Sequence, residues 1–157
     1  MASVTSIDDF LTKLRTALMA RQSLAGVAIY SASVEPESLG TKSILLAAEK
    51  VEADYRYRTL PRKECWEDYT VRATIEAVVP GAGETQIAAA RSAVLGLLEE
   101  LHDYLSSLNG TAACVSALGV DDASITAWSL DQGVTASRER ICRLEVRIAV
   151  SAHFTPS

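Results

Sequence analysis

The chain has few of the residues that build chemical sites, and it has no long apolar run. Its 157 residues include three cysteines and two histidines. Three cysteines are too few, and odd in number, for a disulfide framework, and they indicate a reducing compartment. No run of about 18 apolar residues is present, so we expect no membrane-spanning helix. The N-terminal stretch MASVTSIDDF lacks the basic and apolar regions of a secretory signal.

An excess of basic residues is also missing. Fifteen lysines and arginines stand against 20 aspartates and glutamates, which gives a formal net charge of -5. This balance argues against general nucleic-acid binding, which needs a basic footprint. The chain is 48% hydrophobic, and a chain of this length buries roughly 68–70% of its unfolded surface. We therefore predict a single domain over residues 1–157, without internal repeats or linkers.

The motifs of metal sites and of common hydrolases are absent. There is no Cys-x-x-Cys, no His-x-x-x-His and no Gly-x-Ser-x-Gly. A nucleophilic pair such as Cys142 with His153 is conceivable, but a cysteine on the apolar face of a strand is usually part of the core. We predict no catalytic residue, no metal and no cofactor, and expect that the protein is not an enzyme.

The stretch PGAG at residues 80–83 lies between a predicted strand and a predicted helix, where phosphate-binding turns occur. The dinucleotide fingerprint needs a third glycine at the position of Gln86, and the Walker motif is absent. Glu84 would also place a negative charge at the helix N-terminus, where a phosphate would bind. The glycines are therefore interpreted as a sharp reversal of the chain.

Two amphipathic helices are predicted, over residues 5–21 and 83–109. In the first, Ser6 can cap the helix, and Asp8 and Asp9 favour its positive end. Its apolar face is formed by Ile7, Phe10, Leu11, Leu14 and Leu18. The second has apolar residues at steps of three and four, namely Ile87, Ala90, Val94, Leu97, Leu98, Leu101, Leu105 and Leu108. Asn109-Gly110 is expected to end it.

Five strands are predicted near residues 24–32, 44–58, 69–79, 123–130 and 139–154. Residues 44–50 could be helical or extended. Residues 33–42 are interpreted as an acidic loop and residues 60–68 as a polar connection. The strands over 50–58, 69–79 and 141–150 alternate apolar and charged residues, which is typical of a sheet buried on one face. The predicted class is α+β: a single, mainly antiparallel, twisted sheet of about four to five strands with two helices on one face.

The other face of this sheet carries both signs of charge and is the candidate site for contacts with other subunits or partners. With the two loops, the interface candidates are Glu35, Glu37, Arg56, Arg58, Arg62, Lys63, Trp66, Arg72, Glu76, Arg143, Glu145 and Arg147. Such a face can set the register of a neighbouring subunit. It can equally face water, with its charges paired across strands. The sequence leaves both interpretations open.

The order of these elements resembles a known family. The predicted order begins with an amphipathic helix, a short strand and a long strand. It continues with the loop LPRKECWEDY, the segment YTVRATIEAVVPGAG, a long helix and two closing strands, of which RLEVRIAVSAHF is the last. Over roughly residues 5–154, this order resembles the tail terminator (tail completion) proteins of long-tailed bacteriophages, which are also called minor tail or head–tail joining proteins.

The resemblance implies a structural virion protein that forms a homo-oligomeric ring, commonly a hexamer. The ring would sit at the head-proximal end of the tail, end polymerisation of the tail tube protein and offer a docking surface to the head-completion or connector protein. It would assemble in the host cytoplasm, and DNA would pass through its lumen without specific binding. No membrane is involved. Loops 33–42 and 59–67 are the candidates for contact with a neighbouring subunit.

Two alternatives stay open. The chain could be another adaptor of the phage neck. It could also be a small α+β enzyme or ligand-binding domain, with a site assembled from dispersed residues such as Cys65, His102 and His153.

Overall fold

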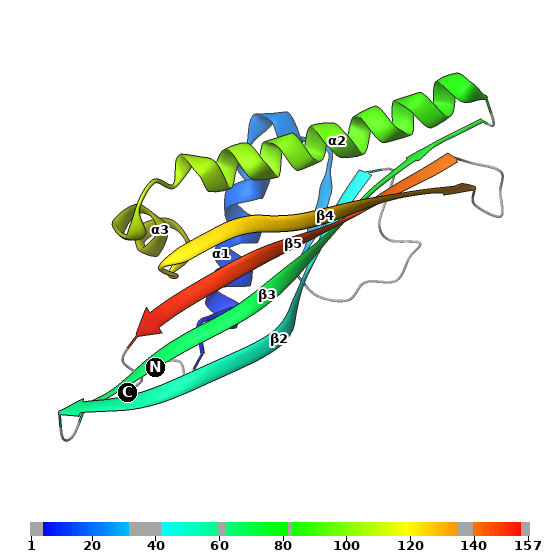
Figure 1. Ribbon diagram of the computed structural model, residues 1–157. Helices are drawn as coiled ribbons and strands as arrows, with labels where there is room; N and C mark the ends of the chain where they lie inside the picture. The colour runs from blue at the N-terminus through cyan, green and yellow to red at the C-terminus, as the bar shows by residue number, and fades with distance from the viewer. Residues whose placement is uncertain (1–4, 32–41, 60–61, 82, 135–139, 155–157) are drawn as a thin grey trace.

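The computed structural model describes residues 5–31, 42–59, 62–81, 83–134 and 140–154. Within these ranges a five-stranded sheet is covered by helices (Figure 1). The elements, in chain order, are α1 (Ile7–Met19), a short 3-10 helix (Gln22–Leu24), β1 (Ala28–Tyr30), β2 (Lys42–Thr59), β3 (Arg62–Val79), α2 (Glu84–Ser107), α3 (Thr111–Leu118), β4 (Asp122–Val134) and β5 (Arg140–Phe154).

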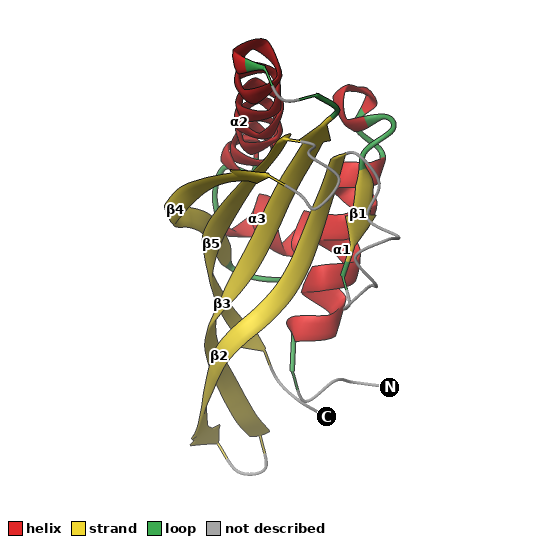
Figure 2. Cartoon of the chain, turned by 90° about the vertical axis from the view of Figure 1, so that its right-hand side faces the viewer, coloured by secondary structure: helices red, strands yellow, loops and turns green. Residues whose placement is uncertain are grey.

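The strands lie in the order β1-β2-β3-β5-β4. β1 pairs in parallel with β2, and the other three pairs are antiparallel. All the helices lie on one side of the sheet, which leaves the opposite side open (Figure 2). This arrangement confirms the predicted α+β class with a mainly antiparallel sheet, and β1 is its parallel exception.

The core lies between the sheet and the helices. α1 packs against β1 and β2, whereas α2 crosses β3, β5 and β4. The alternation predicted for the last strand holds, because every second residue of β5 from Cys142 to Ala152 is buried. The helix stripes meet this surface through fully buried residues such as Phe10, Leu14 and Leu101. The periods of two and 3.6 residues therefore bring the apolar face of the sheet and the apolar stripes of the helices into one core.

Two segments of the long hairpin formed by β2 and β3 are more extended than the sequence indicates. The sequence predicts a polar connection over residues 60–68, but β3 already begins at Arg62 and pairs with β2 as far as Thr59. The ambiguous segment 44–50 is extended and belongs to β2. The polar composition of 62–68 conceals the strand because Glu67, a charged residue, points to the core side together with Cys65.

A third helix, α3, is not predicted from the sequence. The chain leaves α2 after Ser107 and starts a new helix at Thr111, with Gly110 at its N-cap at φ 84°. α3 ends at Gly119, whose left-handed φ of 73° allows its N–H to bond the carbonyl of Val115. The helix is short, and its buried residues are Cys114 and Leu118. Eight residues give too little periodicity to be recognised in a sequence.

The start of α1 is held by a buried polar cluster with β3. The carboxylate of Glu67, which is 2% exposed, accepts hydrogen bonds from the Ser6 N–H at 2.9 Å and the Ser6 hydroxyl at 2.6 Å. The Ser6 hydroxyl also lies 3.1 Å from the hydroxyl of Tyr69, whose ring meets Phe10 edge-on at 6.1 Å. Ser6 makes no capping bond of its own within the helix. Glu67 therefore adds to the negative charge of Asp8 and Asp9 at the N-terminus of α1, which the helix dipole favours.

The buried position of Tyr69 has a consequence at high pH. Burial raises the pKa of Tyr69 to about 12, whereas its bond to Ser6 acts in the opposite direction. Because the pKa of Tyr69 is higher in the folded protein than in the unfolded chain, the protonated phenol contributes to the free energy of unfolding. This contribution is complete below about pH 10 and is lost as the pH rises from about 10 to 12. We expect Tyr69 to ionise late in an ultraviolet titration, well above the pH at which a free tyrosine ionises. In Tyr69→Phe this late step should be missing, and an unchanged titration curve would contradict the assignment.

Candidate assembly surface: the open face of the sheet

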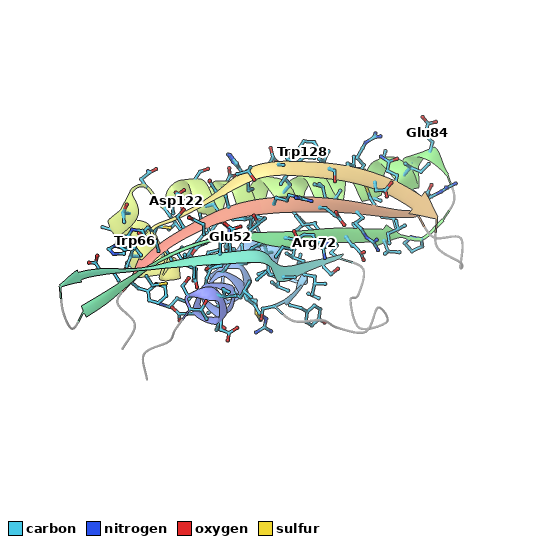
Figure 3. All side chains as sticks on the ribbon, turned by 60° about the horizontal axis from the view of Figure 1, so that its bottom comes forward. Glu52, Trp66, Arg72, Glu84, Asp122 and Trp128 are labelled. Carbon is cyan, nitrogen blue, oxygen red and sulfur yellow. The ribbon has the colours of Figure 1, made fainter. Side chains whose placement is uncertain are left out.

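The side of the sheet that faces away from the helices is called the outer face here. Its residues alternate with the buried ones along each strand. On the central strands they include Asp68, Thr70, Arg72, Thr74 and Glu76 of β3 and Arg143, Glu145, Arg147, Ala149 and Ser151 of β5. Glu49 and Glu52 of β2 belong to the same face, and Figure 3 labels Glu52, Trp66 and Arg72. The outer face is therefore a wide, charged surface that no described helix covers.

Part of this charge is neutralised within the chain. Arg143 donates from Nε to Oε1 of Glu76 at 2.6 Å, and Arg72 lies 3.2 Å from the carboxylate of Glu49. Exposed ion pairs of this kind each stabilise a fold by about 0–1 kcal/mol. They keep the side chains ordered, but they contribute little to the stability of the domain.

Other charges on the outer face are opposed by charges of the same sign. Arg72 is the direct cross-strand partner of Arg147, and Glu52 is the partner of Asp68. Within the described part of the chain, neither Glu145 nor Arg147 lies within 4.0 Å of an opposite charge. Like charges directly opposite each other destabilise a sheet by a few tenths of a kcal/mol or more, up to about 1 kcal/mol. The arrangement is therefore not the one that best stabilises an isolated subunit.

The remaining candidates lie along the hairpin and in the acidic loop. The ring of Trp66 stacks on His153, with centroids 4.3 Å apart and planes 13° apart. Arg56 and Arg58 fall within β2, and Arg62 and Lys63 open β3. These four belong to described strands, but their side chains lie outside the described part. Glu35 and Glu37, with the rest of loop 33–42 up to residue 41, lie outside the described residues. The segment 59–67 is mostly strand, not a loop.

One exposed aromatic residue is missed by the sequence analysis. Trp128 of β4 is 53% exposed, although its cross-strand partner Val146 is fully buried. It therefore lies on the helix side of the sheet, at an edge that α2 does not cover completely (Figure 3). A register shift between Ile125 and Ala127 changes the alternation along β4, so the direction of this side chain cannot be inferred from alternation alone.

The cysteines and histidines do not meet in one site. Cys142 is buried at the start of β5 and His153 is exposed near its end, about 36 Å away for an extended strand. Cys65 is buried on the helix side, whereas His153 beside it lies on the outer face, and His102 is exposed on α2. Burial raises the pKa of the Cys142 thiol, although the charge of Arg91 lowers it. A buried thiol with a raised pKa is a poor nucleophile.

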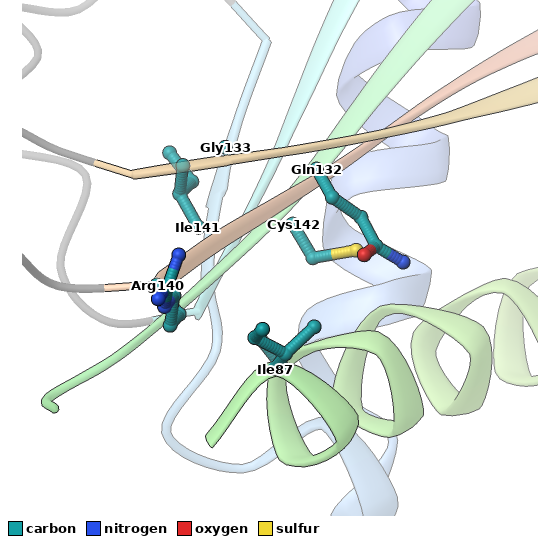
Figure 4. Close-up of a pocket in the computed structure, with 7 residues that line it drawn as sticks. Ile87, Gln132, Gly133, Arg140, Ile141 and Cys142 are labelled. Atoms are coloured by element: carbon teal, nitrogen blue, oxygen red, sulfur yellow. The ribbon is translucent and has the colours of Figure 1, made fainter. Parts of the chain in front are cut away.

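A shallow hollow lies between the first turns of α2 and the paired ends of β4 and β5 (Figure 4). Ile87 of α2 faces Gln132 and Cys142 across it. Its volume is about 170 Å³, and two other hollows on the described surface measure about 260 Å³ each. Sites for small molecules usually enclose about 300–1,000 Å³. These hollows therefore give little support to a ligand-binding domain.

The glycine turn before α2 has the conformation of a reversal. Gly81 has a φ of 101°, which favours glycine, whereas Gly83 is extended with a φ of -83°. The side chain of Gln86 packs back against both glycines. Glu84 lies in the first turn of α2, where its charge complements the helix dipole. The charge of Glu84 thus lies at the helix end where a phosphate would bind, and it would repel such a ligand.

Within the described residues, no three histidine, cysteine, aspartate or glutamate side chains gather where they could hold a metal ion. The helices described here are also too short or too polar to cross a lipid bilayer.

A comparison with solved structures finds a weak structural likeness, whereas comparisons with protein families and curated proteins find none. A chain from a solved structure of the "Virion of native gene transfer agent (GTA) particle" is similar, with a TM-score of 0.46 and 16% sequence identity. The match covers 96% of this chain and 100% of the other. At this TM-score and identity, the likeness decides neither the fold nor the role of the chain.

Proposed function

We propose that this chain is a structural protein of a bacteriophage particle, and that it acts as the tail terminator. In this role, copies form a ring at the head-proximal end of the tail tube, stop its polymerisation and present a surface to the head connector. The resemblance to that family rests on the order of the elements. The described helices and strands follow this order, except that most of the predicted loop belongs to β3 and that α3 is inserted before the two closing strands.

The observation that carries the proposal is the outer face. It is rigid, because it is built on the central strands β3 and β5, whose other face forms the core. It carries Arg72 opposite Arg147 and Glu52 opposite Asp68. Such like-charged pairs are unfavourable in an isolated subunit, but a partner with the opposite pattern would neutralise them. Surfaces of this kind give specificity and register in assemblies.

A ring needs two different patches of one subunit to meet in each interface. The outer face and the two edges of the sheet offer such different patches on one rigid body. The proposed partners are further copies of the chain, the tail tube protein and the head-completion or connector protein. In this proposal the protein has no enzymatic activity and no cofactor, and it resides in the virion.

Electron microscopy of particles assembled without this protein tests the proposal. A tube that lacks its terminator should continue to grow, so we expect tails that are longer and more variable than normal, together with unattached heads. Adding the purified protein back should restore heads on tails of normal length. Tails of normal length without heads would instead indicate a neck adaptor, and normal complete particles would exclude both roles.

A further inference from the structure

β4 is an edge strand with few of the features that usually protect an edge. It runs for 13 residues from Asp122 to Val134 and pairs only with β5 among the described strands. Natural edge strands are commonly shielded by lysine, proline or a short length. The sequence of β4, DASITAWSLDQGV, contains no lysine, arginine or proline. Its middle exposes Ala127, Trp128 and Ser129. The edge is therefore suited to pair with another strand.

The opposite edge of the same sheet is also largely free. β1 covers β2 only at Ser43, Ile44 and Leu45. From Leu46 to Thr59, the edge of β2 that faces away from β3 pairs with no other described strand. This free part of β2 is about as long as β4.

The two edges have compatible directions. β2 and β3, β3 and β5, and β5 and β4 are each antiparallel. β4 therefore runs opposite to β2. A second copy placed beside β4, in the same orientation, would present its β2 as an antiparallel partner. Such a contact is head to tail, and its repetition closes a ring when the rotation between copies divides a full turn.

The charges disfavour an unstaggered contact between the copies. β4 carries Asp122 and Asp131 and no basic residue, whereas the free part of β2 carries Arg56 and Arg58 near its end. In the sheet, Asp122 shares a row with Glu52, through Ser151 and Asp68. Unstaggered copies would thus bring acidic residues together.

A shift of four residues along β2 replaces Glu52 with Arg56 (56 minus 52) as the neighbour of Asp122. Sheets that close on themselves need a stagger between strands. The charges therefore favour the kind of displacement that closure requires.

We propose that β4 of one copy pairs, antiparallel and staggered, with the free part of β2 in a second copy, and that Asp122 lies beside Arg56 at this junction. The pairing deepens the proposed function and rests on it in taking a ring as its product. The alternative of two β4 strands pairing with each other is disfavoured, because that junction would hold Asp122 and Asp131 from both copies without a basic residue.

A charge exchange between copies tests the pairing. Asp122→Arg and Arg56→Glu are made separately, and self-association of the full chain is measured by sedimentation velocity. Each variant should associate at least about tenfold more weakly than wild type, since each interface gains a repulsive contact. An equal mixture should recover wild-type association, because the two variants can alternate around the assembly. Every interface then joins either the two substituted positions or the native Asp122 and Arg56, and both combinations pair opposite charges.

The composition of the recovered assembly can be measured directly. Native mass spectrometry with one variant labelled with ¹⁵N should show equal numbers of both variants in the assembly. An assembly that contains only one of the two would overturn the pairing, because each variant alone carries like charges at the proposed junction.

Two exposed charges of α2 provide the control. Asp103→Arg and Arg91→Glu make the same charge changes on α2, outside the two strands that form the proposed junction, and they should leave association unchanged, alone or mixed. Wild type that stays monomeric up to about 1 mM overturns the pairing. A mixture that fails to recover wild-type association would also overturn it, as would a dimer whose association is weakened by Asp122→Arg but not by Arg56→Glu. Normal association of Arg56→Glu alone would also overturn the pairing.

The two proposals can fail separately. The mixture of variants could recover association while particles that lack the protein have normal tails. That result would support the strand pairing and exclude the role in the tail. Overlong tails without any effect of the charge exchange would retain the role and place the subunit interface elsewhere.

Discussion

The double variant Arg72→Glu/Arg147→Glu is expected to fold normally and to fail in tail completion. The two residues are cross-strand partners at the centre of the outer face. Reversal changes the net charge from -5 to -9 (two residues, two units each) and makes this centre acidic. A partner that is complementary to the arginines would then be repelled, and a mismatch of charges across an interface costs several kcal/mol. Completed particles, counted as infectious units per tail, should fall below detection.

The fold should tolerate this change because Arg72 and Arg147 are surface residues. Arg72 loses its ion pair with Glu49, which stabilises the fold by about 0–1 kcal/mol. The matched control is Lys13→Glu/Arg91→Glu on the helix side. Lys13 is likewise paired, with Asp9 at 3.0 Å, and Arg91 is exposed. The control has the same net charge and should complete tails normally.

Equal loss in both double variants would show an effect of net charge and contradict a role for the outer face. Normal particles from the Arg72/Arg147 variant would remove this face from the assembly altogether. Thermal unfolding of each purified variant separates these results from misfolding.

Among alanine substitutions of polar residues in the strands, Glu67→Ala is expected to cause the largest loss of stability. The variant leaves the N–H and hydroxyl of Ser6 without their buried acceptor. Hydrogen bonds to a charged group contribute about 1.5–3 kcal/mol each, and unsatisfied buried groups add to the cost. We expect a loss of about 2–4 kcal/mol in the free energy of unfolding, which for a domain of this size lowers Tm by roughly 5–15 °C.

Two variants bracket this effect. Glu67→Gln retains an acceptor oxygen but loses the charge at the start of α1, so its loss should be smaller. Asp68→Ala changes the next residue, which is exposed and bonds Ser151 on the outer face at 2.9 Å. It should cost less than about 1 kcal/mol. If Glu67→Ala unfolds at the wild-type temperature, the carboxylate does not hold α1 to β3.

The positions of the main elements could be predicted from the sequence because each has a clear period. Alternation along β5 and steps of three and four residues in α2 reflect burial against one large face. Prediction was wrong where a polar residue points inward. Glu67 is a residue type expected in a loop, and only its contact with Ser6, far away in the sequence, explains how its carboxylate occupies the buried side of a strand. The short helix α3 lacked enough turns to show a period.

The candidate surface divides in the same way. Alternation by itself determined that Arg72, Glu76, Arg143 and Arg147 share a face, because successive side chains of a strand point to opposite sides. Only the tertiary structure decided which charges oppose each other across strands, since register depends on how β3 and β5 align. The same holds for the two free edges. Strand order is a property of the assembled sheet, and neither the exposed Trp128 nor the uncovered part of β2 has a signal in the local sequence.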